Sequence, residues 1–174
     1  AKGADIDIQT QKGNTALMCA ALRVLTDIAS SLIAKGADVD IQDKDGNTAL
    51  IRAAQNGYTD IAASLIAEGA NMDIQTQYGK TALIVAAGKG HTDIAASLIA
   101  KGADMDIQNK DGNTALLLAA QNGHTDIAAS LIAEGADMDI QNEYGWTVLM
   151  LAAENGHSEV AASLIAKGAN MDIQ

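Results

Sequence analysis

The chain has 174 residues, a net charge of −11 at pH 7, and a composition in which small and aliphatic side chains dominate. Only 2% of the residues are aromatic, and phenylalanine and proline are absent. Because negative charge repels phosphate backbones and anionic lipid, nucleic acid and membrane surfaces are not expected partners. No apolar run approaches the roughly 18 residues of a membrane-spanning helix.

The cysteine and hydroxyl chemistry of the chain does not suggest catalysis. The single cysteine, Cys19, cannot form an internal disulfide, which fits a reducing, cytoplasmic compartment. We expect this thiol to pack on a helix as a small hydrophobic side chain. No Ser–His–acid or Cys–His set can be singled out from the repeating pattern, so no enzymatic activity and no cofactor are predicted.

Glycines at a constant spacing divide the chain into copies of one unit. Gly13, Gly46, Gly79, Gly112 and Gly145 are each 33 residues apart, and almost every position between them recurs in kind. A fixed period of this length indicates a repeat array, in which each unit buries its apolar face against its neighbours. The predicted organisation is the tail of a preceding unit at residues 1–10, followed by units at 11–43, 44–76, 77–109, 110–142 and 143–174.

Each unit contains signals for two short helices. In the unit 44–76, Thr48 is placed to cap a first helix, and Asn56-Gly57 is placed to end it. Thr59-Asp60 opens a second helix, which ends at Gly69, where glycine adopts a left-handed cap easily. A polar connector follows, so the sequence predicts an all-α array of helix–turn–helix units.

These features resemble the ankyrin repeat. The period, the Gly-x-Thr-x-Leu opening at 46–50, the paired alanines Ala53-Ala54, the turn at Gly90-His91 and the ending Gly36-Ala37-Asp38 are all similar to that family's pattern. The resemblance covers the whole chain and implies a solenoid with protruding β-hairpin-like connectors. Two features depart from the family: the proline after the capping threonine is missing, and apolar residues replace the histidine that usually follows it.

The first unit is irregular, and neither end looks like a specialised cap. Leu22-Arg23-Val24-Leu25 stands where the other units have a turn with glycine, so Val24 is expected at a position that needs a positive φ. Neither terminal unit shows the polar outer face of a capping repeat. We therefore expect both ends to be cut edges of a longer array, with exposed apolar helix faces that allow end-to-end self-association.

Two rows of polar side chains are candidate metal ligands, but their spacing argues against a shared ion. Stacked helices lie about 8–10 Å apart, which is too far for neighbouring rungs to hold one zinc or calcium ion. We expect each histidine to tie its turn to the next repeat, and the connector aspartates to accept backbone hydrogen bonds from turns. The histidines are His91, His124 and His157, and the aspartates are Asp7, Asp40, Asp73, Asp106, Asp139 and Asp172.

The copies differ most at the connector tips and on the exposed side of the first helix. In the family that the chain resembles, these positions line a concave binding groove. Aromatic and arginine side chains dominate interface energetics, so variable tip residues and nearby cations are the candidate contacts. The alternative is that each tip aromatic packs on the next tip. The candidate partner-binding residues are Tyr78, Lys80, Lys89, Arg52, Tyr144 and Trp146.

The resemblance implies a non-enzymatic protein–protein interaction scaffold that binds its partner through this groove. The negative net charge favours a protein partner with a basic patch. Two alternatives remain open at this stage. Similarity between the copies favours an engineered or consensus-like repeat protein with no natural partner, and the cut ends favour a regulatory fragment of a larger multidomain protein.

Overall fold

The computed structural model describes residues 5–170, in which ten α-helices form five pairs and no strand occurs. The first helices of the pairs have odd numbers and the second helices have even numbers. Their bounds are α1 (Ala16–Leu22), α2 (Thr26–Ala34), α3 (Ala49–Asn56), α4 (Thr59–Ala67), α5 (Ala82–Lys89), α6 (Thr92–Ala100), α7 (Ala115–Asn122), α8 (Thr125–Ala133), α9 (Val148–Glu154) and α10 (Ser158–Ala166).

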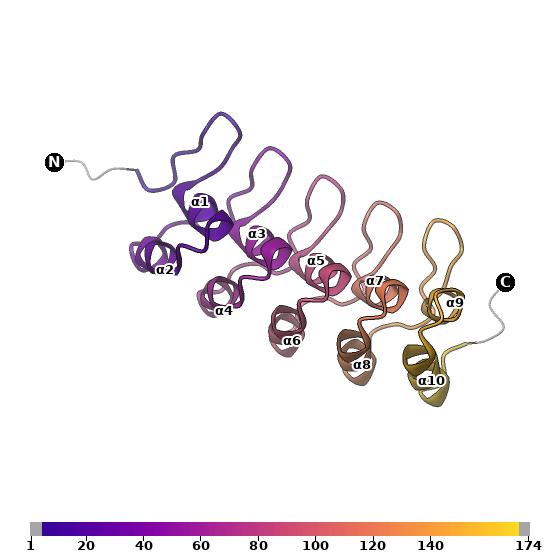
Figure 1. Ribbon diagram of the computed structural model, residues 1–174. Coiled ribbons are helices and arrows are strands. Elements are labelled where there is room, and N and C mark those ends of the chain that lie inside the picture. Colours follow the sequence, from indigo (N-terminus) through magenta and orange to yellow (C-terminus); the bar gives the residue numbers. More distant parts are fainter. Residues whose placement is uncertain (1–4, 171–174) are drawn as a thin grey trace.

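The helix pairs are stacked along one axis, so that the first helices form one row and the second helices form another (Figure 1). Each first helix contacts its own second helix and the first helices of adjacent pairs. The connectors project from the first-helix row as loops that run out and back (Figure 1). This arrangement confirms the predicted all-α solenoid. No described helix has the length and apolar character needed to cross a membrane.

A threonine fixes the start of every first helix. The hydroxyl oxygen of Thr48 accepts the backbone N–H of Ile51 at 3.2 Å, and the same bond recurs in each of the other four pairs. The hydroxyl thereby satisfies one of the backbone donors that a helix start leaves unpaired. The predicted caps are therefore confirmed at Thr15, Thr48, Thr81, Thr114 and Thr147.

Small side chains let the first helices approach each other closely. Ala53 and Ala54 of α3 are completely buried, and Leu50 beside them is almost so. On the second helix of the same pair, Ile61 and Leu65 complete the apolar layer. Fully burying such an aliphatic side chain contributes about 1.5–3 kcal/mol, and here the contact is with neighbouring pairs. Stability therefore comes mainly from stacking.

The connector aspartates join each unit to the next. Asp40 Oδ1 accepts the N–H of Asn71 at 2.9 Å, and Asn71 Oδ1 accepts the N–H of Asp73 at 3.0 Å. Asp73 Oδ1 then accepts the N–H of Asp104 in the following unit. The prediction that these carboxylates accept backbone bonds from turns is confirmed for Asp7, Asp40, Asp73, Asp106 and Asp139. Asp172 lies outside the described residues.

A row of glutamines, which the sequence analysis did not single out, runs beside the aspartates. The side-chain amide of Gln42 donates to the carbonyl of Gly46 in its own tip at 2.8 Å. The same amide donates to the carbonyl of Gln75 in the next unit at 3.1 Å. The recurrence of Ile-Gln at the end of every copy was the signal for this row.

The histidine rings lie against the turn of the preceding unit, so the predicted direction of this contact, toward the next repeat, was wrong. A Cβ built on Gly57 would lie 2.7 Å from the ring of His91, which therefore covers the turn of the unit before it. His124 and His157 lie over the corresponding glycines, and His157 Nε2 is 3.2 Å from the carbonyl oxygen of Gln121. Within residues 5–170, no three His, Cys, Asp or Glu side chains gather as a metal site.

Cys19 also differs from its prediction, because the thiol residue is exposed and does not pack as a core side chain. It occupies the position on α1 that Arg52, Val85 and Leu118 occupy on α3, α5 and α7. This position follows the buried Met18 and precedes the buried Ala20, so it faces out of the first-helix row.

The two ends of the stack leave apolar side chains uncovered. Ile28 of α2 is 50% exposed, whereas the equivalent Ile61, Ile94 and Ile127, each of which has a preceding pair beside it, are buried. At the other end, Ile165 of α10 is 52% exposed, whereas Ile132 at the same position of α8 is buried. Each terminal pair thus presents an isoleucine that stacking covers elsewhere.

Val24 adopts the strained backbone that the sequence predicted. Its φ is +58°, close to the +74° of Gly57 at the equivalent position, and the side chain is 55% exposed. Left-handed backbone costs a β-branched residue about 1–2 kcal/mol of conformational free energy. Because the Val24 side chain is exposed, packing offsets little of this cost.

We therefore expect Val24→Gly to raise the free energy of unfolding by about 1 kcal/mol, as read from thermal or urea melts. The reciprocal control is Gly156→Val, because Gly156 has a φ of +72° and open space around its missing Cβ. That change is expected to cost about 1–2 kcal/mol. A loss of stability in Val24→Gly would mean that Val24 contributes to packing.

Candidate functional site

A hollow of about 470 Å³ lies on the first-helix row, between the connector tips and helices α3, α5 and α7. The tips supply one wall, and the exposed faces of the helices supply the floor. The residues that line it are Asp45, Asn47, Ile51, Arg52, Gln55, Thr76, Gln77, Tyr78, Lys80, Ile84, Val85, Gly88, Lys89, Leu118 and Asn122. Its volume falls within the range of about 300–1,000 Å³ that is usual for ligand pockets.

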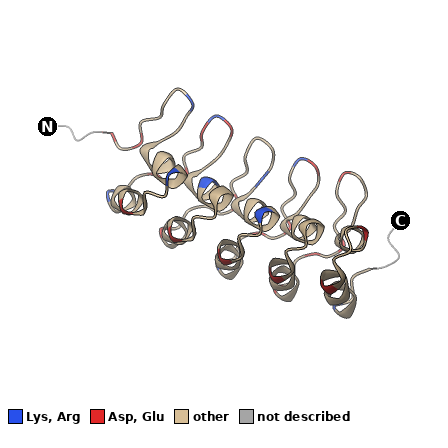
Figure 2. Ribbon diagram, viewed as in Figure 1, with Lys and Arg blue, Asp and Glu red and all other residues tan. Residues whose placement is uncertain are grey.

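The charges in this hollow are opposite in sign to those of the chain as a whole. Three cations, Arg52, Lys80 and Lys89, line it together with one exposed carboxylate, Asp45. The basic segments in Figure 2 include ones on α3, on α5 and on the connector between their pairs, whereas each second helix carries an acidic segment. These acidic residues stand in the first turn of each second helix, at Asp27, Asp60, Asp93, Asp126 and Glu159.

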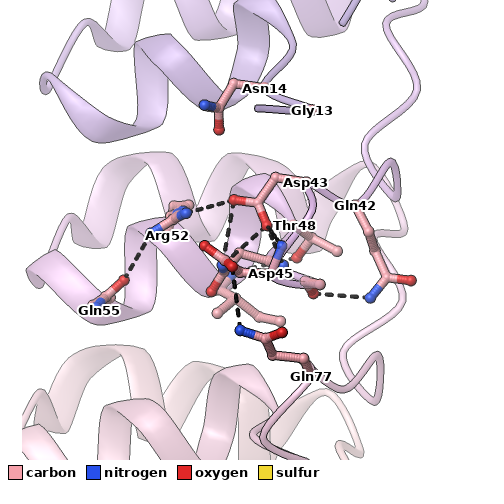
Figure 3. A network of polar contacts seen from close by, with 12 residues as sticks. Gly13, Asn14, Gln42, Asp43, Asp45, Thr48, Arg52, Gln55 and Gln77 are labelled. Carbon is pink, nitrogen blue, oxygen red and sulfur yellow. Dashed lines mark hydrogen bonds and ion pairs between the residues drawn. The ribbon is translucent and has the colours of Figure 1, made fainter. Parts of the chain in front are cut away.

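One wall of the hollow is fixed by an ion pair that has no counterpart in the other units among residues 5–170. Arg52 donates to Asp43 Oδ2 at 2.5 Å, and Asp43 has a side chain that is only 2% exposed (Figure 3). Asp43 Oδ1 also accepts the backbone N–H groups of Asp45 and Asn47, both at 2.9 Å. This network holds the tip against α3.

The surroundings of Asp43 favour its charged form. Burial alone would raise the pKa of this carboxyl group. The backbone bond from Asn47, the hydrogen bonds from the Arg52 and Asn47 side chains, and the positive charge of Arg52 together outweigh burial and lower the pKa of Asp43 below its ordinary value. Arg52 is therefore held in place by a carboxylate, although its Nε is buried without a hydrogen-bond partner in the described part of the chain.

The floor of the hollow is apolar and has a gap at Gly88. Val85 and Leu118 are half-buried there, and Gly88 stands where the second and fourth units have Gln55 and Gln121. A Cβ at Gly88 would meet Leu118 Cδ1 at 3.3 Å and nothing else closer. Leu118 therefore lies close against Gly88, and the glycine leaves this part of the floor without a side chain of its own.

Four of the six predicted contact residues come together in this hollow: Arg52, Tyr78, Lys80 and Lys89. Tyr78 remains 60% exposed although another tip follows it, which argues against the alternative that it packs on that tip. The other two candidates are not among the lining residues. They belong to the last connector, where Tyr144 is 74% exposed and Trp146 is 36% exposed.

The sequence analysis missed the floor of the hollow, Val85, Gly88 and Leu118. A signal for it was present, because this position differs among the first four copies, as Cys19, Arg52, Val85 and Leu118, while the alanine that follows it recurs in every copy. Variation at a partly exposed helix position between buried core positions indicates a surface that is free to serve recognition. Gly88 was a second signal, because Gln55 and Gln121 stand at the equivalent positions of other copies.

The family comparison agrees with this architecture. A family model of ankyrin repeats, spanning three copies, matches residues 1–76, 24–109, 56–142 and 83–174, which together cover the chain. A search of curated proteins finds no match.

Proposed function

Because the chain belongs to the ankyrin repeat family, whose repeats are generally protein–protein interaction modules, we propose that it binds a protein partner through the concave side of its stack. Proteins of this family are typically non-enzymatic scaffolds. The observation that supports this surface is the hollow lined by Arg52, Tyr78, Lys80 and Lys89, in which exposed aromatic and cationic side chains surround an apolar floor. Such a combination is typical of binding hot spots.

Tyr144 and Trp146 form a second contact area at the tip of the last unit. Both are exposed and both belong to the connector that precedes α9, which projects on the same side of the stack as the other connectors (Figure 1). A partner segment that runs along the tips would reach both areas. The fourth-unit tip between them carries Lys110 and Asp111, which are rim charges and contribute less to affinity.

The net charge predicts a partner with a basic patch. This prediction now applies to the outer surface, where the second helices carry acidic residues. The cations that line the hollow do not support a basic segment there, because like charges brought together on binding are costly.

The test is a display selection of protein fragments against the wild-type chain, followed by affinity measurements on variants. We expect Tyr144→Ala with Trp146→Ala, and separately Tyr78→Ala with Lys89→Ala, to weaken binding by about 2–4 kcal/mol. Asp111→Ala should have little effect beyond the salt dependence. The matched outer-face control is Lys35→Ala with Lys101→Ala, at the ends of α2 and α6. Losses confined to that control would place the binding face on the second helices.

We also propose that copies of the chain associate end to end through the exposed isoleucines of α2 and α10. The two faces differ, so the contact would be heterologous and would not close on itself. We expect light scattering to show an apparent mass that rises with concentration, and Ile28→Glu or Ile165→Glu alone to restore the monomer. Thermal melts would check that each variant keeps its fold. A wild-type chain that stays monomeric at high concentration would contradict this proposal.

A further inference from the structure

The two lysines of the hollow have no charge partner in the structure. The ion pair of residues 5–170 joins Arg52 to Asp43, and no carboxylate of the described residues pairs with Lys80 or Lys89. Both lysines are exposed, one on a connector and one in the last turn of α5. Arg52 is paired with Asp43, and Asp45 is the one exposed carboxylate of the hollow, so the two lysines leave a small local excess of positive charge in a chain with a net charge of −11.

The apolar floor lies between these cations and the next helix. Gly88 immediately precedes Lys89 on α5, and Val85 lies one turn earlier on the same face. Leu118 approaches from α7 and would touch a side chain at position 88. The surface at Gly88 is therefore flanked by the aliphatic side chains of Val85 and Leu118, and the two lysines lie at the rim of the hollow.

We propose that this hollow selects an extended acidic peptide segment of the partner, with one aliphatic side chain seated over Gly88 and flanking carboxylates on Lys80 and Lys89. The aliphatic group would bury apolar surface against Val85 and Leu118. The carboxylates would pair with ammonium groups that lack any other partner. This inference rests on the proposed function and assigns a partner chemistry to its groove.

Two other occupants fit the charges less well. A basic segment would bring like charges onto the lysines, which is costly when they are desolvated. A nucleic acid could contact the two lysines, but the acidic remainder of the chain would repel it. Affinity for nucleic acid also depends on many phosphate contacts, and two lysines supply few.

The experiment selects peptides from a random-peptide display library on the wild-type chain and measures them on three variants. The first variant is Lys80→Glu with Lys89→Glu, which reverses the rim charges. The second is Gly88→Gln, which gives the floor the residue found at Gln55 and Gln121; replacing glycine within a helix does not lower helix propensity. The control is Lys35→Glu with Lys101→Glu, which makes the same change in net charge on the outer face, where α4 and α8 already end in Glu68 and Glu134.

We expect the selected peptides to combine Asp or Glu with one large aliphatic residue. Their affinity should fall about tenfold in each hollow variant, equivalent to about 1.4 kcal/mol, and should stay unchanged in the control. Basic or neutral peptides that lose affinity in the hollow variants would overturn the acidic partner and leave the groove intact. Peptides that bind all variants equally, or a library that yields no binder, would overturn both the acidic-peptide assignment and the proposed binding groove. Displacement of the peptides by a single-stranded DNA oligomer, dependent on the same lysines, would also overturn the peptide assignment.

Discussion

Gly112→Ala is expected to lower the free energy of unfolding by about 2–5 kcal/mol, whereas Gly145→Ala, at the same position of the next unit, is expected to cost only about 1–2 kcal/mol. Both glycines have left-handed backbone, with φ of +76° and +78°. They differ in what surrounds the missing Cβ. At Gly112 it would lie 2.6 Å from the backbone nitrogen of Glu143 and 2.8 Å from Asn142 Cα, whereas at Gly145 nothing lies within 4 Å.

The difference between these two variants isolates the contact between neighbouring tips. Backbone strain is common to both, so the excess cost of Gly112→Ala comes from pushing the next tip away. That movement would also break the hydrogen bond from the Glu143 N–H to the Asp111 carbonyl, which is 3.1 Å long. Urea unfolding followed by circular dichroism gives the stability. The fluorescence of Trp146, the only tryptophan, reports on the last tip itself.

Equal losses in Gly112→Ala and Gly145→Ala would contradict a stack held together through its tips. A further expected sign is a separate, earlier transition of the α9–α10 pair in Gly112→Ala, because an array unfolds in parts when one interface is weakened. Gly46→Ala should behave like Gly112→Ala, since its Cβ would lie 2.8 Å from the backbone nitrogen of Gln77.

Features that repeat were predictable from the sequence because every copy supplies independent support for them. The capping threonines, the turn glycines and the connector aspartates needed only local hydrogen-bond chemistry. Val24 could be identified for the same reason, since it stands alone where the other units have glycine. The φ of Val24 follows from that comparison.

The candidate hollow was only half predictable, because its floor depends on which side chains of successive helices meet. Arg52, Tyr78, Lys80 and Lys89 could be recognised individually as variable residues. The contact between Gly88 and Leu118 depends on the distance between α5 and α7, and the repeat length does not determine that distance. The direction of the histidine contacts failed for a similar reason, since spacing along the chain does not say which neighbour a ring covers.

The irregular residues of the second and third units concentrate around this hollow. Asp43 at the end of the first unit and Arg52 in the second have no counterparts in the other copies, and Lys80, Gly88 and Lys89 are unique to the third unit. Elsewhere the repeat pattern serves stacking, which each copy needs equally. Departures that gather on one exposed surface are consistent with a recognition site added to a regular scaffold.

The second large effect is expected at the ion pair of Asp43 and Arg52. Asp43→Ala should lower stability by about 2–4 kcal/mol at neutral pH, because it leaves the Arg52 charge and the tip N–H groups of Asp45 and Asn47 without their acceptor. Asp43→Asn should cost less, about 1–2 kcal/mol, since an amide oxygen can still accept the two backbone bonds. Asn109 accepts the two equivalent bonds from the fourth-unit tip, at 2.9 Å each.

The chain itself supplies the matched control for this pair. Two repeats further along, Asn109 and Leu118 stand at the positions of Asp43 and Arg52, so the double variant Asp43→Asn with Arg52→Leu reproduces a combination that the fold already contains. We expect this double variant to be within about 1 kcal/mol of wild type, because a buried ion pair is often replaceable by a compatible uncharged pair. Arg52→Leu alone should cost about 1–3 kcal/mol by leaving a buried carboxylate without its cation.

The pH dependence gives an independent reading of the same pair. The pKa of Asp43 is lower in the folded chain than the value of about 3.9 that is usual for an unfolded aspartate. The unfolded chain therefore takes up a proton first as pH falls, so the contribution of Asp43 is complete above about pH 5 and is lost as pH falls through the folded pKa. Urea melts at neutral pH and near pH 3 should show that wild type loses more stability than the double variant does. An equal loss in both chains would mean that the ion pair contributes nothing to the acid sensitivity of the array.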